Sequence, residues 1–208
     1  MDADAALGFY RALRGGLTGL DPDRLTSSCL FCPLPQPSYH VTAWDGANDG
    51  NKSFVAPDRR PALDRLLAGL PDALAAPHDM TEAALASPLV CRPDWDISFR
   101  FDRLAIRGAL VARLSPTEDS QEAFAEFVKE RHRLNDFFHE AFGVGAYEDY
   151  TPHVSLGYFA GREGAQMARP SLPEWNALFA QRMQGLTLTF QRAGLYGFTD
   201  METFFKAA

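Results

Sequence analysis

Apolar and polar residues alternate strictly in one stretch near the middle of the chain. Ile97, Phe99 and Phe101 are separated by polar residues, which is the period-2 pattern of a strand with one buried face. The chain then turns over residues 103–108, and residues 109–114 are nearly all apolar, as in a more deeply buried strand. These two segments predict an antiparallel hairpin.

A helical period follows this hairpin. Over residues 118–142, apolar side chains recur every three or four positions, Pro116 precedes the first turn, and Gly143 and Gly145 follow the last turn. We therefore predict one long helix here. The same period predicts shorter helices over residues 4–18 (ending at Gly15-Gly16), 57–74, 81–86 and 173–183.

Further strands are predicted on both sides of these helices. Pro33, Pro35 and Pro37 interrupt regular pairing near the front, because proline donates no ladder hydrogen bond. The predicted strands cover residues 25–31, 39–44, 153–158 and 186–190, with a closing hairpin that runs toward Phe204-Phe205.

The order of these elements predicts an α+β fold. Strands and helices recur in the front and back halves, which indicates two pseudo-symmetric lobes, each a mainly antiparallel sheet with outer helices, around a central cleft. We expect one domain over residues 1–208, with a helical insertion at about 45–93.

Length and charge limit the possible functions. The 208 residues suit one large domain or two closely associated lobes. The net charge of −7 argues against a long nucleic acid as partner, although a mononucleotide or an RNA end needs only a few basic side chains. No apolar run approaches the ~18 residues of a membrane span, and the acidic start is unlike a signal peptide. We expect a cytoplasmic protein without a membrane partner.

The cysteines do not form a convincing metal or redox motif. Cys29 and Cys32 make a lone Cys-x-x-Cys that leads into prolines, and Cys91 stands alone. A zinc site needs a second ligand pair, and a redox pair usually opens a helix. We expect structural or incidental thiols in a reducing compartment and no bound metal or other cofactor.

One short pattern occurs twice. Residues His40-Val41-Thr42 and His153-Val154-Ser155 each place a histidine two positions before a hydroxyl, and each follows a proline. Residues i and i+2 of a strand point to the same face. If the two strands meet in the cleft between the lobes, two imidazoles and two hydroxyls converge. That set supplies a general acid, a general base and neutral hydrogen-bond donors, which suits phosphoester chemistry without a metal.

Several side chains near the motifs are candidate substrate contacts. Tyr39, Trp44, Tyr150 and Tyr158 flank the histidines and could stack on a base. Arg100 points outward from its strand and could bind a phosphate. For the aromatic residues the alternative is a place in the core, and for Arg100 a solvated face.

The chain resembles the two-histidine (2H) phosphoesterase superfamily, which includes RNA 2′,5′-ligase-type proteins and cyclic-nucleotide phosphodiesterases. The resemblance rests on His40-Val41-Thr42, on the segment from Tyr150 to Tyr158, on the strand pair within 97–114, on the long helix before the second motif and on the closing segment. The stretch between the first motif and residue 96 is longer than the family pattern, and Ser155 replaces the more usual threonine while keeping the hydroxyl.

The resemblance implies a metal-independent cyclic phosphodiesterase. Its substrate would be a small nucleotide or an RNA end that carries a 2′,3′-cyclic or related cyclic phosphate, and the protein would be a monomer. One histidine would take a proton from water and the other would protonate the leaving oxygen, with Thr42 and Ser155 on the phosphoryl oxygens. Which histidine is the acid stays open. The alternatives are a nucleotide-binding module without turnover and an interaction protein that uses residues 45–93.

Overall fold

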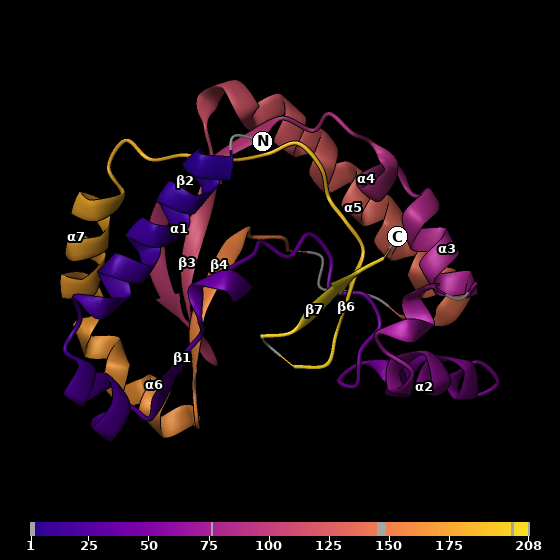
Figure 1. The fold of residues 1–208 in the computed structure, drawn as a ribbon, viewed down its shortest axis with the longest axis horizontal. Helices are drawn as coiled ribbons and strands as arrows, with labels where there is room; N and C mark the ends of the chain where they lie inside the picture. The colour runs from indigo at the N-terminus through magenta and orange to yellow at the C-terminus, as the bar shows by residue number, and fades with distance from the viewer. Residues whose placement is uncertain (1–2, 76, 145–148, 201, 208) are drawn as a thin grey trace. The chain divides into compact units, whose positions relative to one another are not determined.

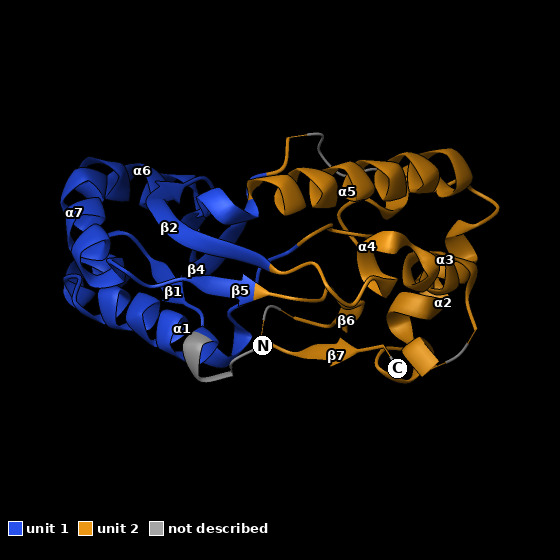
Figure 2. Cartoon of the chain, turned by 90° about the horizontal axis from the view of Figure 1, so that it is seen from above, with its two compact units in different colours: residues 1–42, 97–120, 151–189 blue, residues 43–96, 121–150, 190–208 orange. Residues whose placement is uncertain are grey.

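The computed structural model describes residues 3–75, 77–144, 149–200 and 202–207. Gly145, which the sequence pattern places after the long helix, lies outside these residues. The chain divides into two compact units, coloured separately in Figure 2. Unit 1 comprises Met1–Thr42, Ile97–Ser120 and Thr151–Thr189, and unit 2 comprises Ala43–Asp96, Gln121–Tyr150 and Phe190–Ala208.

Unit 1 contains a curled five-stranded sheet (Figure 1). In sheet order, its strands are β1 (Phe31–Pro33), β4 (His153–Phe159), β3 (Ala109–Pro116), β2 (Ile97–Ile106) and β5 (Leu188–Phe190). The pairs β1–β4, β4–β3 and β3–β2 are all antiparallel. The predicted hairpin over residues 97–114 is therefore confirmed, and so is the α+β class.

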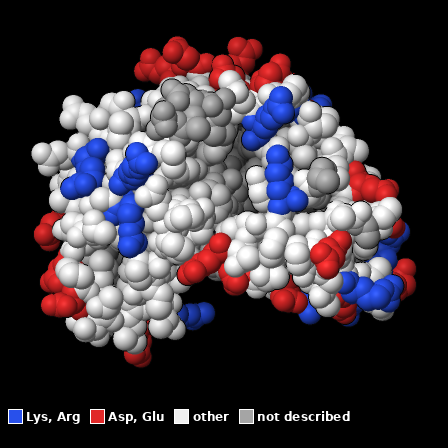
Figure 3. Space-filling model, in the orientation of Figure 1, with Lys and Arg blue, Asp and Glu red and all other residues white. Residues whose placement is uncertain are grey.

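Helices cover one face of this sheet. Helix α7 (Leu172–Met183) packs on β2, and α1 (Ala3–Thr18) packs on α7 and β4. The covered face is wholly apolar where β3 and β4 pair, with Ala112, Val154 and Leu156 fully buried. In Figure 3, basic side chains lie over the part of unit 1 that holds α1 and α7, so the outer surface of these helices is charged. This arrangement leaves the other face of the sheet for polar residues.

Helix α1 confirms the predicted helix over residues 4–18, but Gly15-Gly16 do not end it, since it continues to Thr18. Gly16 serves packing instead. A Cβ atom on Gly16 would lie 2.8 Å from the ring of Phe179 on α7, which is far inside van der Waals contact. The glycine therefore lets the two helices approach closely, and tertiary packing outweighs its low helix propensity.

The predicted strand over residues 25–31 is wrong for most of its length. The chain forms a π-helical turn over Arg24–Ser28 before β1 begins. A carboxylate oxygen of Asp21 accepts hydrogen bonds from the backbone N–H groups of Asp23 and Arg24, and Thr26 donates to the carbonyl of Pro22. These local side-chain bonds give the backbone an alternative to strand pairing.

Unit 2 is built from helices and one hairpin. Its elements are α2 (Arg60–Ala68), α3 (Asp79–Ala86), α4 (Pro88–Cys91), α5 (Gln121–Phe142), β6 (Tyr196–Phe198) and β7 (Phe204–Lys206). The long helix and the closing hairpin are as predicted. The helix predicted over 57–74 is shorter and is followed by a separate 3₁₀ turn (Asp72–Ala75), because Pro71 cannot continue it. Helices α4 and α6 (Arg162–Ala168) were not predicted.

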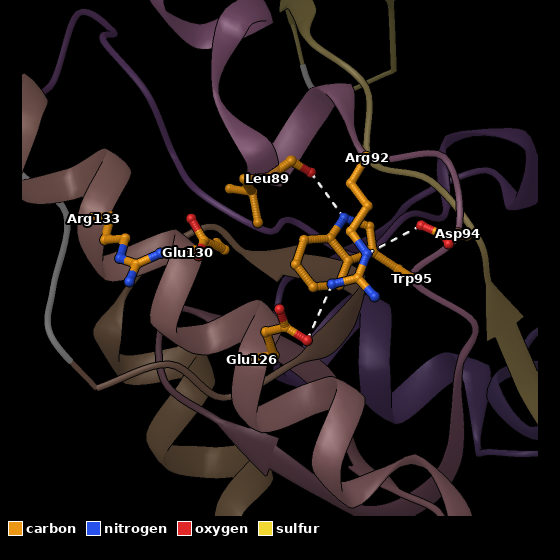
Figure 4. Close-up of polar contacts among 7 residues, drawn as sticks. All are labelled: Leu89, Arg92, Asp94, Trp95, Glu126, Glu130 and Arg133. Carbon is orange, nitrogen blue, oxygen red and sulfur yellow. Dashed lines mark hydrogen bonds and ion pairs between the residues drawn. The ribbon is translucent and has the colours of Figure 1, made fainter.

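Trp95 anchors the core of unit 2. Its side chain is only 2% exposed, and its indole N–H donates to the carbonyl of Leu89 at 3.1 Å. The guanidinium of Arg92 lies 4.5 Å from the indole centroid and is paired with Asp94 and Glu126, each at 3.1 Å (Figure 4). An ion pair between Glu130 and Arg133 lies on the neighbouring turn of α5. No helix of the described residues is long and apolar enough to cross a membrane.

Candidate functional site: a two-histidine face on the sheet of unit 1

The two histidine motifs meet through one backbone bridge. Val41 pairs with Val154 in antiparallel orientation, so the central residues of the two motifs lie directly opposite each other. By this register, His40 faces Ser155 and Thr42 faces His153. Side chains at these flanking positions point away from the valines, which places both imidazoles and both hydroxyls on one face.

Burial agrees with this register in the second motif. Val154 is fully buried against the helices, whereas His153 and Ser155 are partly exposed. In the first motif His40, Val41 and Thr42 are all partly exposed. Opposed Cβ atoms on an antiparallel pair are about 4.5–5.5 Å apart and diagonal ones about 7–8 Å apart. The two histidines are diagonal to each other. The space between them can therefore take a phosphoryl group with an imidazole on each side.

Two earlier predictions about this arrangement need correction. The residues of the first motif form only a bridge at Val41, not a strand over 39–44. Both motifs also belong to unit 1, not one to each lobe: His153-Val154-Ser155 begins β4, and the first motif pairs with it at Val41. The reason is the path of the chain after β1: prolines interrupt its pairing with β4, and the chain returns to the same strand edge a few residues later.

Both imidazoles are held in the same way. Nδ1 of His40 lies 2.8 Å from the carbonyl oxygen of Ser38, and Nδ1 of His153 lies 2.9 Å from that of Thr151. A carbonyl oxygen can only accept, so in each histidine Nδ1 carries the hydrogen. The neutral rings therefore have their basic nitrogen at Nε2, and in the charged form Nε2 is the acid. The bonds also fix the ring orientation.

Local sequence explains how these carbonyls are placed. Before His40, a 3₁₀ turn over Gln36–Ser38 is closed by two bonds from Ser38, through its N–H and its hydroxyl, to the carbonyl of Pro35. Before His153, the carbonyl of Pro152 accepts from the N–H of Leu114 on β3. In each motif the preceding proline thus lies in a fixed backbone segment, and the carbonyl two residues before the histidine faces its ring.

Arg113 is a site residue that the sequence did not reveal. It lies opposite His153 in the β3–β4 register, and its Nη2 donates to the hydroxyl of Thr151 at 2.9 Å. Thr151 thus binds Arg113 through its side chain and His153 through its carbonyl. Arg103, opposite Arg113 on β2, extends the cationic row by one strand. A signal existed: Arg113 is the one charged residue in the otherwise apolar run 109–114.

Two of the predicted substrate residues lie on this sheet. Tyr158 is on β4, opposite Ala109 on β3 and Cys32 on β1, and is partly exposed. Arg100 pairs with Ser115, two residues beyond Arg113, and is exposed. Both therefore flank the histidine face, one toward each end of the sheet.

Tyr39 lies elsewhere, because it points into the core of unit 1. It is 5% exposed, and its ring packs edge-on against that of Tyr10 on α1. Burial raises the pKa of its phenol, and the guanidinium of Arg14 opposes this shift. The hydroxyl has no hydrogen-bond partner among the described residues. Its position explains the orientation of its neighbour: with Tyr39 inward, His40 points outward.

Trp44 and Tyr150 belong to unit 2, where they make structural contacts. The indole N–H of Trp44 donates to the side-chain oxygen of Asn135 at 3.2 Å, and its ring packs on Phe138. Tyr150 packs on Phe127, with the guanidinium of Arg131 5.0 Å from its ring centroid. Burial raises the pKa of Tyr150. Trp44 and Tyr150 thus have roles in the packing of unit 2.

The cysteines do not assemble. All three are free thiols, with Cys29 buried and Cys32 and Cys91 exposed. Within the described ranges, no group of three or more His, Cys, Asp or Glu side chains is arranged to hold a metal ion.

Comparison with known proteins adds no assignment. Neither a scan against protein-family models nor searches of curated proteins and of solved structures find a match.

Proposed function

We propose that the histidine face of unit 1 opens cyclic phosphodiesters by two-histidine acid–base catalysis, as the resemblance to 2H phosphoesterases implies. One observation supports this proposal most directly. The Val41–Val154 bridge puts His40 and His153 on one face, and each histidine has its Nδ1 on a backbone carbonyl. Two imidazoles with equivalent orientation and basic Nε2 atoms are what a proton relay through a bound phosphate requires.

The reaction uses one histidine in each protonation state. Water attacks phosphorus and loses a proton to Nε2 of the neutral imidazole, while the bond from phosphorus to one ribose oxygen breaks. The imidazolium gives its Nε2 proton to that leaving oxygen. The product is a phosphomonoester with a free hydroxyl, and the two histidines have exchanged protonation states, which solvent then resets. Each proton transfer contributes on the order of 10²–10⁴-fold to the rate.

The neighbouring polar groups have a separate task. Negative charge builds on the non-bridging oxygens as water attacks, and preformed donors stabilise it most in the transition state. Thr42 and Ser155 stand beside the histidines across the bridge. Arg113, opposite His153, adds a guanidinium that matches phosphate geometry. Tyr158 at the end of the same sheet is the aromatic residue we assign to a base.

The proposal includes the further properties that the resemblance to 2H phosphoesterases implies. They are the pseudo-symmetry of two lobes, a monomeric cytoplasmic protein, and a small nucleotide or RNA end as substrate. Residues 45–93 fall in unit 2, and we assign them to substrate selection rather than to chemistry, because the histidines, the hydroxyls and Arg113 all come from unit 1.

The test is hydrolysis of nucleoside 2′,3′-cyclic phosphates in the presence of EDTA. We expect the wild-type protein to give a nucleoside monophosphate. His40→Ala and His153→Ala should each lower kcat at least about 10²-fold, since each removes one proton transfer. His139→Ala, which changes an exposed histidine of α5, is the matched control and should keep full activity.

Two results would contradict the proposal. Full turnover in both alanine variants would show that the imidazoles are not used. Micromolar binding of a nucleotide without any product from the wild-type protein would instead support a binding module. Circular dichroism of each variant separates loss of chemistry from loss of fold.

A further inference from the structure

Unit 2 contains a cavity that the histidine chemistry does not use. Its volume is about 560 Å³, within the usual range of small-molecule sites, about 300–1,000 Å³. It is lined by the end of α3, helix α4 and residues 92–93, together with residues 192–195 and the end of β7. Every residue that lines it belongs to unit 2.

The lining combines cations with an apolar floor. Arg92, Arg192 and Lys206 are its charged residues, and it includes no aspartate or glutamate. The apolar part of the lining consists of Leu85, Val90, Leu195 and Ala207. Arg92 is paired with Asp94 and Glu126, which are not among the lining residues, so the uncompensated positive charge comes from Arg192 and Lys206. In a chain with a net charge of −7, this local positive charge favours anions.

Two of the three cations are available for a ligand. Neither Arg192 nor Lys206 is paired with a carboxylate of the described residues. Arg192 makes one long bond, from Nε to the carbonyl of Pro93 at 3.4 Å. Both side chains are solvent-exposed, so they can turn toward a bound anion without breaking an ion pair.

Arg92 is different, because it is already fixed in place. Its Nε and Nη1 bind Asp94 and Glu126, and its guanidinium lies 4.5 Å from the indole centroid of Trp95 (Figure 4). Such a guanidinium loses little conformational entropy when a further acceptor binds to it. It gives the cavity one cation that is already held in position.

We propose that this cavity binds a small organic anion whose acidic group lies among Arg92, Arg192 and Lys206 and whose apolar body rests on Leu85, Val90 and Leu195. The cations select the charge, and the apolar floor selects against inorganic anions, which have nothing to place on it. This site is separate from the proposed chemistry, since none of its residues comes from unit 1.

Two exposed thiols make the test specific to each site. Cys91 lines the cavity, whereas Cys32 lies opposite Tyr158 on the sheet of unit 1. The full-length protein is treated with iodoacetamide, and modification of each cysteine is followed by mass spectrometry. Three compounds are added in separate experiments. Phenylphosphonate supplies both the charge and the apolar body of the proposed ligand, inorganic phosphate supplies the charge alone, and benzyl alcohol supplies the apolar body alone.

We expect phenylphosphonate to slow the modification of Cys91 at least about fivefold at saturation, and the other two additions to have little effect. Arg192→Gln/Lys206→Gln should abolish this protection, and Arg192→Lys/Lys206→Arg should restore it, because the charge is kept. His40→Ala/His153→Ala should leave it unchanged.

The alternative outcomes overturn the proposal. Equal protection by inorganic phosphate would show that the apolar floor is not used. Protection of Cys32 but not of Cys91 would place the anion on the histidine face. Protection of Cys91 that survives the double glutamine variant would show that the cations do not bind the ligand. Thermal unfolding of both double variants confirms that they remain folded.

Discussion

At the scale of single residues, the orientation of each histidine depends on the backbone carbonyl that accepts a hydrogen bond from its Nδ1. Thr151 illustrates this: its carbonyl accepts from His153, and its hydroxyl accepts from Arg113. The carbonyl of Ser38 accepts from His40 in the same way, but the hydroxyl of Ser38 donates to the carbonyl of Pro35. The two histidines are thus oriented alike, and His153 also has the guanidinium of Arg113 opposite it by register.

Replacing Arg113 tests this difference. Arg113→Gln removes a charged donor to Thr151 and a candidate phosphate contact, so we expect kcat/KM for a cyclic nucleotide to fall about 10–100-fold, the range for one hydrogen bond to a charged group. Arg113→Lys should recover part of the loss, since it keeps the charge but not the planar fork. Initial rates over a range of substrate concentration give kcat and KM separately.

Arg169→Gln is the matched control for this prediction. Arg169 is an exposed arginine in a 3₁₀ turn of unit 1, and its replacement should change neither constant. If Arg113→Gln behaves like this control, Arg113 has no part in the site.

At the scale of elements, the position of β1 on β4 decides where the first motif lies. Gly157 on β4 faces Pro33 on β1 and Leu110 on β3. A Cβ atom there would overlap the carbonyl of Cys32 and the ring of Phe31. The glycine therefore permits the close pairing of β1 with β4, and the chain beyond β1 then reaches Val41 at the edge of the same strand.

Gly157→Ala should accordingly destabilise unit 1. The added methyl must push β1 away from β4, and overpacking of this kind costs about 1–3 kcal/mol of unfolding free energy. Urea unfolding followed by circular dichroism measures the change. Gly108→Ala is the matched control: it lies in the turn between β2 and β3 with nothing within 4 Å of a new Cβ, and it should leave stability unchanged or slightly raised. Equal stability of both variants would contradict the role given to Gly157.

At the scale of the whole molecule, buried tyrosines link stability to alkaline pH. Burial raises the pKa of Tyr10 on α1 to about 12, and it also raises the pKa values of Tyr39 and Tyr150. A tyrosine whose folded pKa exceeds its unfolded value of about 10 binds its proton more tightly in the folded state. Its contribution is complete below about pH 10 and is lost as the pH rises to about 12.

The unfolding free energy should therefore fall steeply above about pH 10, with Tyr10 contributing on the order of 2 kcal/mol across that interval. Tyr10→Phe should flatten this part of the curve, and Tyr196→Phe, which changes a half-exposed tyrosine, should not. Urea unfolding at a series of pH values measures both slopes. Parallel curves for the wild-type protein and Tyr10→Phe would show that burial of this phenol is not coupled to stability.

The sequence alone predicted most elements and the shared face of the histidine and hydroxyl within each motif. The strand at residues 97–101, the long helix and the closing hairpin were predicted from local patterns. The structure confirms them because local periodicity determines which face of an element is apolar. The i, i+2 spacing of His40 with Thr42 and of His153 with Ser155 likewise fixed that each pair shares a face.

Only the tertiary structure decided how these parts meet. The pairing of Val41 with Val154, the place of Arg113 opposite His153 and the inward turn of Tyr39 join residues far apart in the chain. Such contacts follow from strand register and helix packing, which local patterns do not encode, because one register shift moves every side chain to the other face. For the same reason the sequence pattern predicted the two histidines in separate lobes, whereas the fold has both in unit 1, with His153 in β4 and His40 next to the Val41 bridge.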